Sequence, residues 1–141
     1  MIDFSAYLSS ISNDVSQWAS YLVSQGLSKA CSRAMAGFYL LLHAYGMRPV
    51  ITSIYRSPEK QAAMRSAWLA GNRQGLRFLP AKNSDHCHQD KNFFGLLIPG
   101  SYAMDIDLGT KQYSDAAMIA HSLGLSTGFE IGDEVHYFYR P

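Results

Sequence analysis

The stretch from residue 47 to residue 70, MRPVITSIYRSPEKQAAMRSAWLA, decides the fold class. Its first part, MRPVITSIY, carries the β-branched residues that are typical of a strand. Ser57 and Pro58 then predict an N-cap followed by proline at the first helical position, so we expect a helix to begin there and to run to about Ala70. The stretch therefore predicts one strand that leads directly into one helix.

Helices are predicted before this stretch and strands mostly after it. Apolar residues at helical spacing predict a helix that ends near Gly26 and a second one from Ser28 to about Tyr45. The later elements are a hairpin that pairs residues 93–98 with residues 102–108 across Pro99-Gly100, a short helix over residues 114–123 and a strand over residues 135–139. This order predicts an α+β fold in which a small antiparallel sheet carries the site and helices cover its other face.

Composition and charge narrow the class of protein. A chain of 141 residues, 48% of them hydrophobic, is expected to form one domain, with a helical part (residues 1–45) and a motif-bearing part (residues 46–141). The formal net charge of +1 argues against a nucleic-acid binder. The chain has no run of about 18 apolar residues, and its first residues lack the basic and apolar regions of a signal peptide. We therefore expect a cytoplasmic monomer that binds no nucleic acid and does not insert into membranes.

Three residues are candidate metal ligands. His86 and His136 have acidic neighbours, and Asp105 stands in the otherwise apolar segment Ala103-Met104-Asp105-Ile106. A carboxylate is costly to bury there unless a cation or a metal holds it. Two imidazoles and one carboxylate, with a fourth position left to water, are a ligand set used by catalytic zinc sites. From residue types alone, metal binding is one hypothesis beside ordinary structural roles.

Four segments in order resemble the motifs of a known family of zinc peptidases. They are ITSIYRSPEKQ (residues 51–61), SDH (84–86), AMDI (103–106) and GDEVHYFY (132–139). The family is that of the D-alanyl-D-alanine carboxypeptidases and L-alanyl-D-glutamate endopeptidases, which share a fold with the hedgehog signalling domain. The resemblance covers about residues 41–141 and leaves out the first two predicted helices.

The resemblance implies that His86, Asp105 and His136 bind zinc. It also implies that Asp133, three residues before the last histidine, is the general base that takes a proton from the attacking water and passes it to the leaving amine. The neighbouring Glu134 competes for this role. We rank Glu134 second because its side chain is expected to point away from the face of His136.

Polar residues upstream are implied to bind substrate. Arg56 matches the arginine of the family's Tyr-Arg-Ser segment, and its guanidinium suits a peptide carboxylate or the oxyanion of a tetrahedral intermediate. Gln61 is expected to orient Arg56 or to contact substrate. Ser84 is expected to form a hydrogen bond beside the site, since no base is spaced to activate it as a nucleophile.

The pattern departs from the family between the first histidine and the aspartate, where a tight turn containing glycine is usual. Residues Cys87 to Tyr102 form an insertion here, which we expect to be a hairpin or flap beside the cleft. The insertion supplies two alternative ligands, His88 and Cys87, and Asp107 is an alternative carboxylate. The Ser-x-His match favours His86 over these two, and the Ala-x-Asp-Ile match favours Asp105 over Asp107.

The resemblance implies a zinc-dependent peptidase that hydrolyses an amide bond of the peptidoglycan stem peptide. Since no anchor or wall-binding module is evident, we expect a phage endolysin of the endopeptidase type, held in the host cytosol until it is released to the cell wall. A D,D-carboxypeptidase or dipeptidase is the alternative, and an insertion that closes the cleft would favour it. A non-catalytic wall-binding or virion structural module is the alternative from another class, and a fourth protein ligand would favour that.

Overall fold

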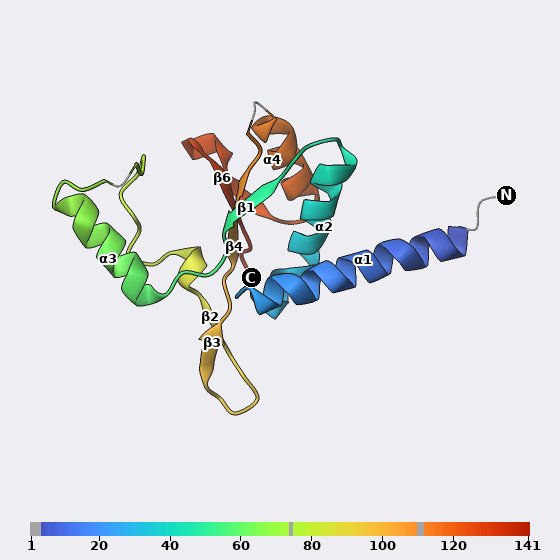
Figure 1. The fold of residues 1–141 in the computed structure, drawn as a ribbon, viewed down its shortest axis with the longest axis horizontal. Helices are drawn as coiled ribbons and strands as arrows, with labels where there is room; N and C mark the ends of the chain where they lie inside the picture. Colours follow the sequence, from blue (N-terminus) through green and yellow to red (C-terminus); the bar gives the residue numbers. More distant parts are fainter. Residues whose placement is uncertain (1–3, 74, 110–111) are drawn as a thin grey trace.

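The computed structural model describes residues 4–73, 75–109 and 112–141, and their fold is α+β, with a small antiparallel sheet packed against helices (Figure 1). The α-helices are α1 (Phe4–Ser24), α2 (Ser32–Ala44), α3 (Pro58–Leu69) and α4 (Tyr113–Ser122). The strands are β1 (Val50–Ser53), β2 (Gln89–Lys91), β3 (Leu97–Pro99), β4 (Ala103–Asp107), β5 (Ser126–Gly128) and β6 (Asp133–Phe138). Short 3-10 helices are η1 (Lys29–Cys31), η2 (Asp85–Cys87) and η3 (Phe129–Ile131).

The main sheet has four antiparallel strands in the order β1-β4-β6-β5. Because side chains alternate along a strand, Met104 and Ile106 of β4 point to one face and Asp105 to the other. Tyr137 and His136 are divided between the two faces of β6 in the same way, and Asp105 lies directly opposite His136 in the register. One face of the sheet is therefore apolar and the other carries candidate ligands.

The apolar face packs against α1, α2 and α4 to form the core. Leu22 of α1 and Phe38 of α2 are fully buried, and the Phe38 ring centroid lies 4.6 Å from that of Tyr137. Helix α2 covers most of the helix predicted from Ser28 to about Tyr45, but it ends at Ala44, and Tyr45 beyond it is 67% exposed. Tyr45 therefore does not belong to the core.

Removing the Phe38 ring is expected to leave a cavity against the sheet. Phe38→Ala should lower the free energy of unfolding by about 3–5 kcal/mol, because the buried ring loses its partners and the core collapses only in part. Urea denaturation measures the change. Met118→Ala on the exposed side of α4 is the control, and it should shift the value by no more than about 0.5 kcal/mol. Equal losses in the two variants would contradict this description of the core.

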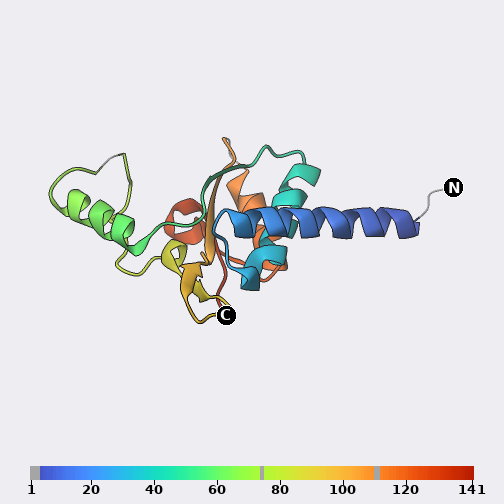
Figure 2. The same ribbon diagram turned by 60° about the horizontal axis from the view of Figure 1, so that its bottom comes forward.

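Two helices project from opposite sides of the sheet (Figures 1 and 2). Helix α1 extends to one side, and α3 with the loop that follows it extends to the other. Ser57 caps α3 by accepting a hydrogen bond from the Lys60 amide, and proline follows it, as the sequence predicts. In the described part of the chain, no helix is long and apolar enough to cross a membrane.

The predicted hairpin between residues 93–98 and 102–108 is wrong. Instead, β3 pairs with β2, while β4 lies in the main sheet between β1 and β6. The chain reverses earlier, at Asn92 to Leu96, because Gly95 adopts a positive φ of 77° and the Asn92 side chain accepts hydrogen bonds from the turn. The Pro99-Gly100 pair instead leads the chain from the hairpin back to the body of the protein. The Cys87–Tyr102 insertion is thus a hairpin, as expected, but its second strand pairs with β2 inside the insertion and not with residues 102–108.

Candidate metal centre and cleft

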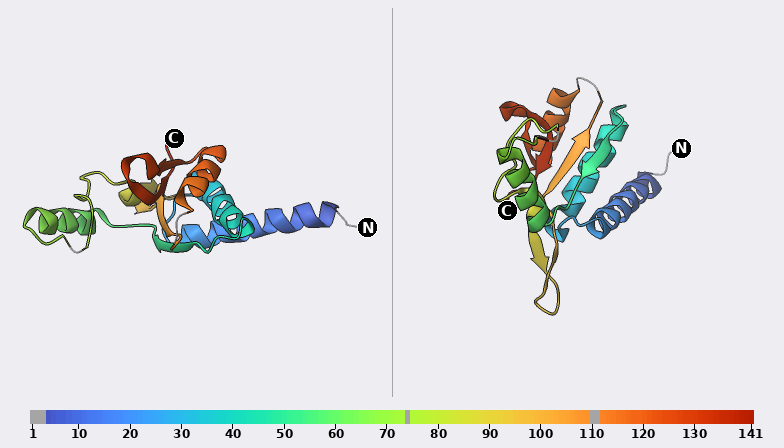
Figure 3. Two further views of the ribbon diagram at one scale, coloured as in Figure 1. Left: turned by 90° about the horizontal axis from the view of Figure 1, so that it is seen from above. Right: turned by 60° about the vertical axis from the view of Figure 1, so that its left-hand side comes forward.

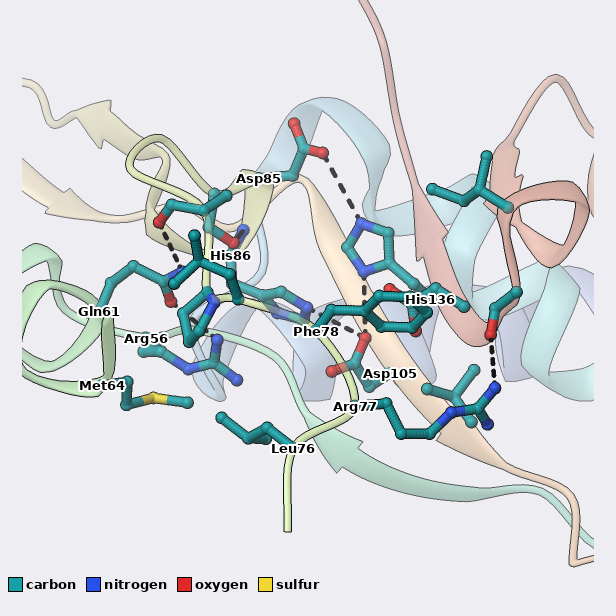
Figure 4. Close-up of a pocket in the computed structure, with 18 of the residues that line it drawn as sticks. Arg56, Gln61, Met64, Leu76, Arg77, Phe78, Asp85, His86, Asp105 and His136 are labelled. Carbon is teal, nitrogen blue, oxygen red and sulfur yellow. Dashed lines mark hydrogen bonds and ion pairs between the residues drawn. The ribbon is translucent and has the colours of Figure 1, made fainter. Parts of the chain in front are cut away.

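A cleft of about 600 Å³ lies over the polar face of the sheet, and the three candidate ligands line it (Figure 4). Its walls come from α3, the loop of residues 75–84, η2 and the start of β6. His86, Asp105 and His136 each offer one ligand atom, and these atoms all lie within 4.8 Å of one another. The sequence-predicted ligand set is therefore brought together as one group that could hold a metal ion.

His86 is held by its backbone and by its ring. The Ser84 side chain caps η2 by accepting a hydrogen bond from the His86 amide, and the His86 ring is only 3% exposed. Its Nδ1 lies 2.6 Å from the carbonyl oxygen of Ile54, which can only accept, so Nδ1 carries a proton and donates it. The Nε2 atom of His86 consequently faces Asp105, at 3.1 Å from Oδ1.

His136 approaches the same carboxylate oxygen from the neighbouring strand. Its Nδ1 lies 3.1 Å from Oδ1 of Asp105, and its other nitrogen, Nε2, lies 3.7 Å from Oδ2 of Asp85 (Figure 4). The antiparallel register places His136 directly across from Asp105, so the sheet itself sets this geometry. Asp85 is adjacent to His86 in the chain and reaches over to the second histidine.

The charges of the group are strongly coupled. Burial by itself would raise the pKa of Asp105, but hydrogen bonds from His136 and His86 outweigh it and hold this pKa well below its usual range. Burial would lower the pKa of His136, but the hydrogen bonds to Asp105 and Asp85 raise it to about 9. The hydrogen bond from His136 also lowers the pKa of Asp85. Two carboxylates, Asp105 of the group and Asp85 beside it, thus flank His136 and favour a cation between them.

The donor set fits a metal ion. Both ring nitrogens of His86 face acceptor oxygens, and so do both of His136. Each ring must therefore carry a second proton or place its lone pair on a metal beside Asp105. Ligand atoms that surround zinc tetrahedrally lie roughly 3.4 Å apart, close to the 3.1 Å separations found here.

Arg56 lines the same cleft and is held in place by Gln61. Its Nη1 donates a hydrogen bond of 2.8 Å to Oε1 of Gln61, while the Gln61 amide nitrogen donates to the carbonyl oxygen of Ala81. Gln61 is buried, and so it supports Arg56 as the sequence suggested. In the described part of the chain, Arg56 has no acidic partner, so its guanidinium is available to an anionic group in the cleft.

Asp133 and Glu134 both line the cleft, but only one of them is paired. Glu134 lies 3.5 Å from Arg77, whereas the side chain of Asp133 makes no hydrogen bond or ion pair with the other described residues. Burial raises the pKa of Asp133. The expectation that Glu134 points away from the cleft is wrong, because residues two apart on a strand share a face. Asp133 also lines the cleft because the pairing of β5 with β6 is irregular beside it.

The alternative ligands lie elsewhere. The ring of His88 stacks on Tyr102 and its Nδ1 donates to the carbonyl oxygen of Gly100. Cys87 is a free thiol that contacts the carbonyl oxygen of Ser57. Asp107 accepts hydrogen bonds from Gly109 and Tyr113 at the exposed end of β4. None of these three side chains belongs to the ligand group.

Two residues of the cleft were not singled out from the sequence. Asp85 contacts His136, and Arg77 connects the loop after α3 to β6 through Glu134 and the carbonyl oxygen of Gly132. Asp85 sits inside the Ser-x-His segment, yet nothing in the spacing indicates contact with a histidine 51 positions later. Arg77 stands in a polar loop with no motif of its own.

Comparison of the chain with protein-family models, with curated proteins and with solved structures found no match. The function is therefore inferred from the chemistry of the cleft and from the order of the motifs. Both concern the same residues, since every predicted ligand and substrate-binding side chain lines this one cleft.

Asp85→Asn is expected to weaken metal binding without abolishing it. The carboxylate lies 3.7 Å from Nε2 of His136, so it favours the ring form that is protonated there and whose Nδ1 lone pair faces Asp105. Loss of such a supporting carboxylate typically lowers metal affinity by about 10–100-fold. Competition titration with a chromophoric chelator measures the change. Unchanged affinity in this variant would show that Asp85 does not support the ligand.

The stability of the metal-free protein should depend on pH through His136. Its pKa is raised from 6.5 to about 9, so the stabilisation from the charged ring is full below pH 6.5 and is lost as pH rises through about 9. The pKa of Asp105 is lowered, so its contribution is present above its usual pKa of 3.8 and is lost as pH falls through the lowered value. Thermal unfolding in excess chelator at a series of pH values measures both the loss of stability at high pH and the loss at low pH.

Above neutral pH, metal affinity should change in the opposite direction to the stability of the metal-free protein. A metal competes with the proton on His136, so the apparent metal affinity should rise as pH increases from 6.5 towards 9. Affinity that stays constant across this interval would contradict the assignment of His136 as a ligand.

Proposed function

We propose that this chain is a zinc-dependent peptidoglycan peptidase with a fold related to that of the D-alanyl-D-alanine peptidases and the hedgehog domain. One observation carries the proposal. The His86, Asp105 and His136 group, the Asp133 carboxylate and Arg56 all line a single cleft, and neither Asp133 nor Arg56 has an ion-pair partner among the described residues. These five residues occupy the five functional positions of the family motifs, in the same order along the chain.

The composition of the site supports zinc and an open coordination position. Two imidazoles and a carboxylate are a ligand set of catalytic zinc, and no fourth ligand belongs to the group within the described residues. Zinc bound there would acidify a water molecule and polarise the carbonyl of the scissile amide. The absence of a fourth partner in this group favours an enzyme over a structural zinc module.

Each remaining residue has a role that its surroundings support. Asp133 has no competing partner and its pKa is raised, so it can accept a proton from the attacking water and deliver it to the leaving amine. Arg56, fixed by Gln61, can bind the oxyanion that develops on the substrate carbonyl or a nearby substrate carboxylate. Ser84 acts through the backbone of His86 and is therefore a positioning residue.

The cleft favours an endopeptidase over a carboxypeptidase. No residue of the Cys87–Tyr102 insertion lines the cleft, so the insertion does not close it around a chain end. An extended stem peptide could therefore pass through. We further propose that the enzyme is a phage endolysin, held in the host cytosol until it reaches the wall.

Digestion of purified peptidoglycan tests the proposal. The full chain is incubated with the polymer after zinc loading and, in parallel, after treatment with a chelator, and new peptide termini are identified by mass spectrometry. We expect new termini within the stem peptide that disappear with chelator and return when zinc is restored. Cleavage between L-alanine and D-glutamate would identify the endopeptidase, and free D-alanine would identify the carboxypeptidase. No cleavage, or cleavage that chelator does not affect, would refute the peptidase.

A further inference from the structure

The β2–β3 hairpin ends in an exposed apolar tip. The exposed fractions are 98% for Phe93, 81% for Phe94, 63% for Leu96 and 60% for Leu97. The hairpin projects away from the sheet and the helices (Figure 1 and the right panel of Figure 3). These four residues, here called the apolar tip, contribute nothing to the core or to the cleft.

Several polar backbone groups of the tip are hydrogen-bonded within the turn. The side-chain oxygen of Asn92 accepts hydrogen bonds from the backbone amides of Phe94 and Leu96. The backbone carbonyl oxygen of Asn92 accepts one from the amide of Gly95. The Asn92 amide donates to the carbonyl oxygen of Leu96. A turn that satisfies these groups internally can enter an apolar medium at small cost, because few backbone donors lose hydrogen bonds to water.

The shape of the tip suits a lipid interface better than a protein surface. All three residues of β3 are exposed, so apolar side chains stand on both faces of the hairpin. The rings of Phe93 and Phe94 meet edge to face, with centroids 5.5 Å apart. A protein groove contacts mainly one face of a strand, whereas acyl chains surround an inserted tip on every side.

The charges near the hairpin suit an anionic headgroup layer. Lys91 is exposed and lies directly across from Leu97 of the tip, and the exposed Lys29 follows Ser28, which contacts the hairpin at Asp90. The nearby carboxylate of Asp90 is occupied, since it accepts a hydrogen bond from Ser28 and lies 3.6 Å from Nδ1 of His88. The same contacts fasten the hairpin to the body of the protein, so the tip is presented in one orientation.

In contrast to the expectation from the sequence that the chain does not insert into membranes, we propose that the apolar tip inserts into the interfacial layer of an anionic phospholipid bilayer, with Lys91 and Lys29 at the headgroups. No helix in the described residues is long and apolar enough to cross the bilayer, and the net charge of +1 supplies no general attraction, so binding depends on the tip. This surface is separate from the cleft, and the inference stands whether or not the chain is a peptidase.

Co-sedimentation with vesicles tests the inference. The full chain is mixed with vesicles of phosphatidylcholine and phosphatidylglycerol, and with vesicles of phosphatidylcholine alone. We expect binding that is stronger on the anionic vesicles. The double variant Phe93→Ser/Phe94→Ser should lose roughly tenfold or more in affinity. The control, Leu69→Ser/Met118→Ser, removes two exposed apolar residues from α3 and α4 (63% and 71% exposed) and should bind like the wild type.

Further measurements keep the outcomes distinct. Lys91→Gln should weaken binding by about fivefold on anionic vesicles and leave binding to phosphatidylcholine unchanged. Circular dichroism should be the same for every variant, since the tip touches no core residue. The inference is wrong if the wild type does not sediment with either vesicle, or if the control variant loses as much as the tip variant. It is also wrong if the wild type is a dimer in solution and only the tip variant is a monomer, because a second copy would then cover the tip.

Discussion

Asp133→Asn is expected to slow peptidoglycan hydrolysis by about 10²–10⁴-fold while zinc still binds, which is the effect of removing a general base. The amide is nearly the same size as the carboxylate but cannot accept the proton of the attacking water. Asp133 is not in the ligand group, so the metal site should remain intact. Release of soluble muropeptides measures the rate, and metal analysis of the same sample measures zinc.

Glu134→Gln is the matched comparison, because the two carboxylates are adjacent and both line the cleft. Glu134 is paired with Arg77 and its loss should loosen the loop after α3, with a smaller effect on the rate than the loss of Asp133. If the Glu134 variant were inactive and the Asp133 variant active, the general base would be Glu134. If neither change affected hydrolysis, Asp133 and Glu134 would both be excluded as the general base, which would contradict the proposed mechanism.

His86→Ala is expected to lower zinc affinity by more than about 100-fold, beyond the usual effect of a residue that only supports a ligand. The substitution removes one of three donors from a group whose remaining members, Asp105 and His136, offer too few ligands for tight binding. Metal content after dialysis against buffered zinc measures the loss, and hydrolysis should disappear with it.

His88→Ala serves as the control, since it removes a histidine two positions away that stacks on Tyr102 instead of facing the cleft. It should keep the zinc content and the activity of the wild type, with at most a small loss of hairpin stability. Zinc that is released by the His88 change alone would overturn the ligand assignment. Release by neither change would show that the three-residue group does not hold zinc.

Local signals along the chain predicted most elements but not their partners. Ser57 and Pro58 predicted the start of α3 because capping depends on residues next to each other. Strand pairing depends on distant segments, and there the sequence prediction failed, since β3 pairs with β2 and not with β4. Strand β5 was missed because three residues, Ser126 to Gly128, are too few to show a periodic pattern.

The candidate ligands could be named from the sequence because motif spacing and residue type are properties of the chain itself. The sequence alone also determined that Asp105 stands in an apolar strand and that a histidine follows three residues after Asp133. Only the tertiary structure decided that His86, not His88, faces Asp105, because the carbonyl of Ile54 holds the ring. It also decided that Asp85 supports His136 and that the inserted hairpin points away from the cleft. These outcomes depend on contacts between segments far apart in the chain, which no local pattern encodes.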